Sequence, residues 1–258
     1  MSDRTGRDTP QVDDAGLRRR SAMHAALGEP VRLALVDRLA LADASPGELG
    51  GELGLPTNLL AHHLRVLEEA GLIRRRRSDG DRRRSYVQLV TDDPLVASLA
   101  AALPTSARIG EEVSRVVFVC TRNTARSQLA AAAWARRSQV PVASAGTHPA
   151  DRVHPRAVRT ARRHGLSLEA TGTRHVSQVA RPGDLLVAVC DNAYEEFTVR
   201  PATDAQPGPV QADRDWLHWS VPDPVPADSD QAFEDAYQQI TGRVDRLALA
   251  LDPGALSA

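Results

Sequence analysis

The residue types best suited to chemistry lie in the segment Cys120 to Ser127, which reads Cys-Thr-Arg-Asn-Thr-Ala-Arg-Ser. The apolar run Val116–Val119 precedes this segment, and a stretch with helical character, Gln128–Trp134, follows it. A cysteine and an arginine separated by five residues, between a strand and a helix, form a cradle for an oxyanion. Loop N–H groups point inward, the helix N-terminus adds positive potential, and the Arg126 guanidinium can bind two oxygens. We therefore expect Cys120 to be a thiolate nucleophile.

The loop itself is expected to supply the oxyanion-binding groups. These belong to Thr121, Arg122, Asn123, Thr124, Ala125, Arg126 and Ser127. We expect Asn123 to hold an unusual backbone conformation through side-chain hydrogen bonds, and Ser127 to donate a hydrogen bond to the Cys120 sulfur. The alternative is a buried structural cysteine at a strand end, six residues before an unrelated arginine.

This segment resembles the active-site loop of the superfamily of low-molecular-weight protein tyrosine phosphatases and arsenate reductases. Three later segments resemble further motifs of that family, in the same order. Ser144–Thr147 resembles its second strand, Leu185–Asp191 its third strand, and Trp219–Pro224 the late loop that carries its general acid. The resemblance covers about residues 113–251. It implies an α/β three-layer domain with a parallel four-stranded sheet.

The resemblance also assigns roles to the candidate residues. Cys120 would attack a phosphate ester or arsenate in line, while Arg126 and the loop N–H groups stabilise the developing charge. Asp223, followed by Pro224, would protonate the leaving oxygen. An Asp-Pro pair can equally be only a turn, but this one lies after Leu217–Trp219 and before an amphipathic last helix.

Residues near the two cysteines bear on which oxyanion is bound. Tyrosine phosphatases of this superfamily typically carry a second cysteine where Ala125 lies, and an aromatic rim that grips an aryl ring. The segment Arg126–Gln128, preceded by an alanine, resembles the arsenate reductase branch more than the phosphatase branch. Cys190–Ala193 resembles the strand end with the first resolving cysteine of thioredoxin-coupled reductases, which releases arsenite and leaves a disulfide. The resemblance therefore implies a catalytic role for Cys190, and the alternative is a buried thiol at a strand end.

Two departures from the family pattern bear on turnover. A second resolving cysteine follows shortly in those reductases, whereas this chain has only two cysteines, Cys120 and Cys190. Three alternatives stay open: a disulfide between them reduced by a thioredoxin-like partner, a low-molecular-weight thiol that resolves Cys120, or binding of arsenate or phosphate without turnover. No cofactor is expected apart from such an external thiol or thioredoxin-like reductant. Arg122 stands where the family commonly has glycine, so it could alter the loop backbone or add a cation at its rim.

The first half of the chain predicts a compact unit that begins near Arg19. The expected elements are a helix over Ala25–Leu39, a short helix capped by Ser45, a helix over Thr57–Glu69, and a β-hairpin over Leu72–Val90 with a polar, arginine-lined tip. This order is typical of an α+β winged helix-turn-helix. The phrase His63–Leu72 resembles the ArsR family of bacterial repressors, and that resemblance covers about residues 20–102.

A winged helix-turn-helix predicts contacts with a double-stranded DNA operator. The candidate DNA-binding residues are Thr57, Asn58, His62 and Arg65 on the third helix, and Arg75, Arg77, Arg82 and Arg83 on the wing. His63 is expected to be structural or DNA-facing. The alternative is a solvated charge run on a protein–protein module. Pro94–Leu103 reads as a helix that forms the dimer in that family, so we expect a homodimer.

Metal-sensing repressors of the ArsR family carry cysteine pairs near the DNA-binding unit, or acidic and histidine ligands on the dimer helix. This chain has no cysteine before Cys120 and no histidine within Pro94–Leu103. We therefore expect no metal site, and a signal that enters through the second domain.

Composition sets the outer bounds. The 258 residues suffice for two domains, and we expect a disordered N-terminus over 1–18, a winged helix domain over 19–103, a linker over 104–113 and the oxyanion-binding domain over 114–258. The formal net charge is −1, so DNA contact needs a local basic patch, and every basic residue is arginine. The polar start and the lack of a membrane-length apolar run predict a cytoplasmic protein.

These observations favour a DNA-binding regulator fused to an arsenate reductase-like domain, acting in the response to arsenic. The alternatives are a phosphatase-type enzyme of the low-molecular-weight class, and a repressor that senses an oxyanion without catalysis.

Overall fold

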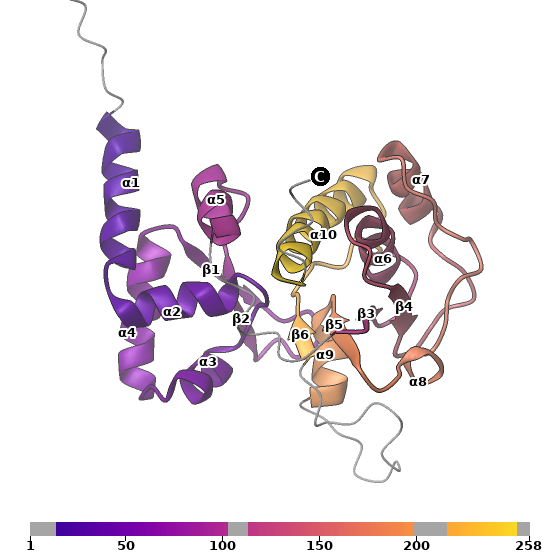
Figure 1. The fold of residues 1–258 in the computed structure, drawn as a ribbon, viewed down its shortest axis with the longest axis horizontal. Coiled ribbons are helices and arrows are strands. Elements are labelled where there is room, and N and C mark those ends of the chain that lie inside the picture. The colour runs from indigo at the N-terminus through magenta and orange to yellow at the C-terminus, as the bar shows by residue number, and fades with distance from the viewer. Residues whose placement is uncertain (1–13, 103–112, 199–215, 252–258) are drawn as a thin grey trace, which may run out of the picture.

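The computed structural model describes residues 14–102, 113–198 and 216–251 (Figure 1). Their buried apolar side chains form two main cores. One is built from the helices and the hairpin of the first half, and the other surrounds a sheet in the second half. The linker expected at 104–113 lies outside the described residues except for Val113.

The first half consists of short helices and one hairpin. Its elements are α1 (Asp14–Leu27), α2 (Pro30–Leu39), α3 (Pro46–Leu53), α4 (Thr57–Glu69), β1 (Ile73–Arg77), β2 (Ser85–Leu89) and α5 (Pro94–Ala102). Ser45 and Glu48 form a capping box at the start of α3, and Gly54 ends it in a left-handed conformation. Because Leu60, Leu64 and Leu67 of α4 recur at helical spacing, all three reach the core.

Two expectations for this half were wrong. The single helix expected over Ala25–Leu39 is two helices, because Pro30 cannot continue a helix and forces Glu29 into an extended conformation. The Glu29 side chain then accepts a hydrogen bond from the Arg32 N–H and caps α2. In addition, α1 begins at Asp14, so part of the expected disordered N-terminus, 1–18, is helical. This helix buries Met23 against the helical core, which stabilises it.

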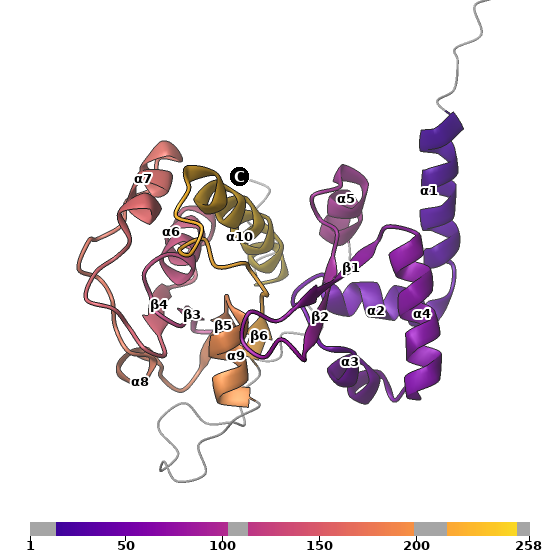
Figure 2. The same cartoon turned by 180° about the vertical axis from the view of Figure 1, so that it is seen from behind.

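The second half confirms the expected parallel four-stranded sheet in an α/β domain. The strands are β3 (Arg115–Cys120), β4 (Val142–Gly146), β5 (Asp184–Ala188) and β6 (Trp216–His218), in the spatial order β4-β3-β5-β6 and all parallel. The helices are α6 (Arg126–Arg137), α7 (Pro155–Arg163), α8 (Val176–Val179), α9 (Asp191–Thr198) and α10 (Asp230–Leu251). Helices α6, α7 and α10 lie on one side of the sheet, and α8 and α9 on the other (Figures 1 and 2). A strand covered on both faces must be apolar throughout, which explains the run Val116–Val119.

The sheet explains why residues distant in sequence meet. Parallel strands end at the same edge, and ligands bind there in open α/β sheets. Cys120 ends β3, Gly146 ends β4, Cys190 follows β5 and Asp223 follows β6. The edge therefore collects the chemistry-bearing segments that the sequence singles out.

The hairpin reaches from the first half to the second. Its loop runs beside β6 and α9 (Figure 2). Ser78 is only 2% exposed, and its hydroxyl donates a hydrogen bond to Glu195 at 2.6 Å. The Tyr86 hydroxyl donates to the same carboxylate at 3.0 Å. The tip of the hairpin, expected to be polar and lined by arginines, is thus partly buried against the other domain.

A glycine makes this close approach possible. A Cβ atom added to Gly80 would lie 2.6 Å from a Glu195 carboxylate oxygen and 2.8 Å from the side-chain oxygen of Asn192. A larger residue at position 80 would therefore have to displace these two side chains or move the hairpin away from α9.

No helix within the described ranges is long and apolar enough to cross a bilayer.

A pair of leucines on α4 tests the account of the helical core. Leu64 is 1% exposed, whereas Leu59 on the opposite side of the helix is 41% exposed. Leu64→Ala should lower the free energy of unfolding by about 2–5 kcal/mol, because it removes buried methyl groups and leaves a cavity. Leu59→Ala should stay within about 0.5 kcal/mol of the parent. Urea unfolding followed by circular dichroism measures both, and equal losses would contradict the assignment of the buried face.

Candidate functional site

The loop after β3 is held with its carbonyl groups facing outward. The carbonyl oxygens of Cys120, Thr121, Arg122 and Thr124 accept hydrogen bonds from the N–H groups of Thr147, His148, Ala150 and His154, at 3.1, 2.8, 3.1 and 2.9 Å respectively. With those carbonyls turned away, loop N–H groups can point inward, as Asn123 shows by donating its N–H to the Cys120 sulfur at 3.2 Å. The result is an anion-binding concavity with the sulfur at its base.

Asn123 fixes the sharp bend in this loop. Its φ is 54°, in the left-handed region that asparagine adopts more readily than most residues. Its side-chain oxygen accepts from the Arg174 N–H at 3.0 Å, and its amide donates to the Ser127 hydroxyl at 2.8 Å. The Ser127 oxygen lies 3.1 Å from the Cys120 sulfur. Asn123 thus makes the side-chain hydrogen bonds expected of it, and the Ser127 hydroxyl lies within hydrogen-bond distance of the sulfur, where either atom can donate.

Gly146 lets β4 pack against the loop. A Cβ atom at this position would lie 2.8 Å from the Thr121 carbonyl oxygen and 3.0 Å from the Asn123 backbone nitrogen. Both of these atoms belong to backbone that is itself hydrogen-bonded, so neither can move aside cheaply. This explains the glycine of the Ser144–Thr147 motif.

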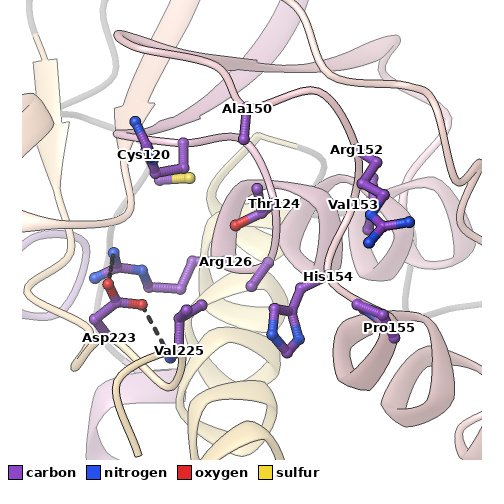
Figure 3. Close-up of a pocket in the computed structure, with 12 residues that line it drawn as sticks. Cys120, Thr124, Arg126, Ala150, Arg152, Val153, His154, Pro155, Asp223 and Val225 are labelled. Carbon is purple, nitrogen blue, oxygen red and sulfur yellow. Dashed lines mark hydrogen bonds and ion pairs between the residues drawn. The ribbon is translucent and has the colours of Figure 1, made fainter. Parts of the chain in front are cut away.

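Arg126 is the buried cation of the site. One guanidinium nitrogen donates to the Val221 carbonyl at 2.9 Å, and the other lies 3.3 Å from an Asp223 carboxylate oxygen (Figure 3). Burial alone lowers the pKa of Arg126, but the nearby Cys190, Asp223 and Cys120 more than offset this, so the pKa lies above its usual value. Arg126 therefore stays charged and draws the segment with Asp223 to the pocket.

Cys190 lies behind the pocket and does not line it. Its side chain is fully buried, and its sulfur is 3.6 Å from the Thr121 hydroxyl oxygen. Burial raises the pKa of the Cys190 thiol, and the neighbouring Cys120 raises it further, while Arg126 opposes both. Both cysteines are free thiols.

The cavity in front of Cys120 has a volume of about 470 Å³. It is lined by Cys120, Arg122, Thr124, Ala125, Arg126, Ala150, Arg152, Val153, His154, Pro155, Asp223 and Val225, most of them labelled in Figure 3. Among the described residues, no Phe, Tyr or Trp lines this cavity. Of the expected oxyanion-binding residues, Thr121, Asn123 and Ser127 do not line this cavity and act instead as supports of the loop.

Sequence reasoning missed two residues of the rim, Arg152 and His154. His154 caps α7 and stacks on Phe233 with ring centroids 4.9 Å apart, which fixes that side of the pocket. The cue was its place directly before Pro155, a favoured first residue of a helix. Arg152 offers no comparable cue, because nothing in its local sequence distinguishes it from other surface arginines.

The candidate DNA-binding residues lie on two surfaces. Thr57, Asn58, His62 and Arg65 are exposed on α4, and Arg75, Arg77, Arg82 and Arg83 are exposed on the hairpin. Helix α4 lies on the side of the first half that faces away from the sheet domain (Figures 1 and 2). His63 is buried, with its ring 3.5 Å from the Glu29 carboxylate, so its role is structural.

A glycine substitution tests the anion-binding loop. Gly146→Ala should lower the free energy of unfolding by about 1–3 kcal/mol, because the added methyl group overpacks the loop backbone. It should also weaken phosphate binding measured by calorimetry, since the inward N–H groups move. Gly172→Ala is the matched control, because a Cβ there meets its nearest neighbour at an ordinary 3.4 Å. Unchanged phosphate affinity in a folded Gly146→Ala protein would argue against the role given to this loop.

Two family models match the chain. The model described as low molecular weight phosphotyrosine protein phosphatase matches residues 115–255, and a helix-turn-helix domain model matches residues 27–76. A comparison with curated proteins found no match.

Solved structures similar to the second half include arsenate reductases and tyrosine phosphatases. An arsenate reductase from Archaeoglobus fulgidus is 27% identical, with a TM-score of 0.41, over 52% of this chain and 98% of its own. The tyrosine phosphatase Wzb from Escherichia coli, solved with sulphate, is 26% identical, with a TM-score of 0.44, over 54% of this chain and 99% of its own. The tyrosine phosphatase AmsI from Erwinia amylovora is 20% identical, with a TM-score of 0.44, over 55% of this chain and 96% of its own.

The loop at Cys120, the parallel sheet and the match over more than half of the residues agree. The chain belongs to the low molecular weight phosphotyrosine protein phosphatase family and carries a helix-turn-helix DNA-binding domain ahead of that domain.

Proposed function

We propose that this protein is a DNA-binding regulator whose second domain binds arsenate at Cys120, reduces it with the help of Cys190, and thereby alters DNA binding in a response to arsenic. The observation that carries the proposal is the convergence of four groups in one pocket. The Cys120 sulfur, the inward loop N–H groups, the buried Arg126 and the Asp223 carboxylate all meet there.

The pocket lining supports a small, highly charged oxyanion. Arg122 and Arg152 add positive charge at the rim, while the described lining residues include no Phe, Tyr or Trp to hold an aryl ring. Neither the Arg122 nor the Arg152 side chain has an ion-pair partner within the described residues. Hydrolysis of a phosphate ester at the same Cys120 is the second candidate function, which membership of the phosphatase family favours.

The chemistry follows from the geometry. The Cys120 thiolate attacks arsenic, and an arsenate oxygen leaves as water after accepting a proton, for which Asp223 is the candidate donor. Cys190 then attacks the Cys120 sulfur as a thiolate, so that a disulfide forms and As(V) departs as arsenite, As(III). The two thiols supply the two electrons, and an external thiol or a thioredoxin-like protein reduces the disulfide again. Since burial raises the pKa of Cys190, its deprotonation depends on the nearby Arg126.

The first domain would supply the DNA contacts. Exposed Thr57, Asn58, His62 and Arg65 on α4 suit base edges and phosphates in a major groove. The proposal includes a homodimer through α5, as in the ArsR family that this half resembles. It also places the protein in the cytoplasm, where DNA and thiol reductants are both present.

Two cysteine variants separate reduction from hydrolysis. Cys120→Ser should abolish both arsenite production and p-nitrophenyl phosphate hydrolysis, because both need the nucleophile. Cys190→Ser should stop arsenite production with a thioredoxin-like reductant and leave the hydrolysis near the parent rate. Arsenite production and p-nitrophenol release, measured with several thiol donors, check this. If Cys190→Ser still reduces arsenate with thioredoxin, the relay is wrong. If the parent protein turns over neither substrate, the site is at most a sensor.

A binding experiment tests the link to DNA. Duplexes selected from a random-sequence library by the parent protein would be titrated with the parent protein and with Cys120→Ser, each with and without arsenate. The parent protein should bind DNA with a different affinity when arsenate is present, and Cys120→Ser should respond less because it lacks the thiolate. Fluorescence anisotropy at fixed salt measures all four affinities. Four identical affinities would remove the proposed coupling.

A further inference from the structure

The segment that carries Asp223 makes most of its hydrogen bonds to the other domain. Five hydrogen bonds join Trp219–Asp223, the acid segment, to residues of the first half. The Trp219 indole donates to the Leu41 carbonyl (2.8 Å), the Ser220 N–H to Asp43 (2.7 Å), the Gln88 amide to the Ser220 carbonyl (3.0 Å), Arg76 to the Ser220 hydroxyl (2.9 Å), and the Asp223 N–H to Asp79 (3.3 Å).

From its own domain the acid segment receives few hydrogen bonds within the described residues, although Trp219 and Val221 are buried in the apolar core of that domain. The Trp219 N–H donates to the Ala188 carbonyl at 2.8 Å, and Arg126 binds the Val221 carbonyl and the Asp223 carboxylate. Asp223 therefore sits between Arg126 on the pocket side and Asp79 of the hairpin on the other. Asp79 lies close enough to Arg126 to raise the pKa of that guanidinium, along with the thiols and Asp223.

A buried carboxylate anchors the hairpin in this position. Asp191, 1% exposed, accepts a hydrogen bond from the Asp79 N–H at 2.8 Å and another from Arg76 at 3.2 Å. Although burial alone raises the pKa of Asp191, its hydrogen bond with His218 is the main opposing effect, and the pKa lies below the usual value. Asp191 thus stays ionised and keeps Arg76 and Asp79 beside the acid segment. Arg76 also donates to the Asp79 carboxylate at 2.7 Å, which orients it.

The hairpin has two faces with different partners. Successive residues of a strand point to opposite sides. Arg76 faces the sheet domain, whereas Arg75 and Arg77, both candidates for phosphate contact, are exposed. One short strand therefore presents arginines to solvent and an arginine to the acid segment.

We infer that Arg76 and Asp79 of the hairpin are positioning residues for Asp223, so that the DNA-binding domain completes the catalytic site of the other domain. The inference deepens the proposed function, because it takes Asp223 as the proton donor. Asp79 acts through the Asp223 backbone and Arg76 through Ser220; neither need touch the substrate. DNA contact with this hairpin would therefore act directly on the position of Asp223.

The dependence on the leaving group tests the positioning role in the full chain. Phenyl phosphate has a poor leaving group and needs the proton, whereas p-nitrophenyl phosphate needs it much less. Asp79→Ala should lower kcat/KM for phenyl phosphate by about tenfold or more, with a clearly smaller fall for p-nitrophenyl phosphate. Asp79→Asn, which keeps an acceptor oxygen for the Asp223 N–H, should recover part of the loss. Equal falls for both esters, or parent values for Asp79→Ala, would overturn the inference.

Asp81→Ala is the matched control. It removes a carboxylate from the same hairpin tip, and this carboxylate accepts a hydrogen bond from Arg83 at 3.0 Å. It should keep the parent ratio between the two esters.

A second measurement does not need turnover. Amide hydrogen exchange of residues 216–225, followed by mass spectrometry of the full chain, reports how firmly the Ser220 and Asp223 N–H groups are held. Exchange there should be faster in Asp79→Ala than in the parent and in Asp81→Ala. Unchanged exchange would overturn the inference. If the parent hydrolyses neither ester but the exchange responds as expected, the hairpin still positions the segment and only the proposed catalysis fails.

Discussion

The direction of four peptide groups after β3 is the constraint on which the rest of the site depends. Four carbonyl oxygens between Cys120 and Thr124 are taken by N–H groups of 147–154, and Asn123 accepts a left-handed φ to make the bend. Only this orientation leaves N–H groups free to face an anion beside the sulfur. Gly146 matters because the two backbones must approach without a Cβ between them. The chemistry of Cys120 is thus a property of backbone geometry as much as of the thiol.

A second constraint is the ionic and polar contact between the two halves. Asp43 is 4% exposed, yet it binds both the Ser220 N–H and Arg243 of α10, at 2.7 and 3.0 Å. Glu195 likewise accepts hydrogen bonds from Ser78 and Tyr86 of the hairpin. Buried charges need such partners, and losing one partner costs more than the pair contributes. These contacts therefore specify one arrangement of the domains more than they stabilise it.

Much of the fold could be predicted from the sequence, because its signals are local. The apolar run before Cys120, the capped helix at Ser45 and the polar tip of the hairpin are all signals that depend on neighbouring residues. The break within the helix expected over Ala25–Leu39 could also have been predicted, since Pro30 excludes a continuous helix. The packing of the hairpin against the sheet domain could not be predicted from the sequence, because Asp191 and Glu195 lie more than a hundred residues from their partners in the hairpin. The place of Arg152 in the pocket could not be predicted for the same reason, because only the fold brings it there.

The most direct test of the account is the reactivity of the two thiols in the folded protein at neutral pH. Iodoacetate reacts with the thiolate, and the site of modification is read by mass spectrometry. The account predicts rapid modification of Cys120, protection of Cys120 by phosphate, and no modification of the fully buried Cys190. A Cys120 that reacts no faster than an ordinary free cysteine, or one that phosphate does not protect, would contradict the central claim that this loop holds a reactive sulfur nucleophile in an anion site.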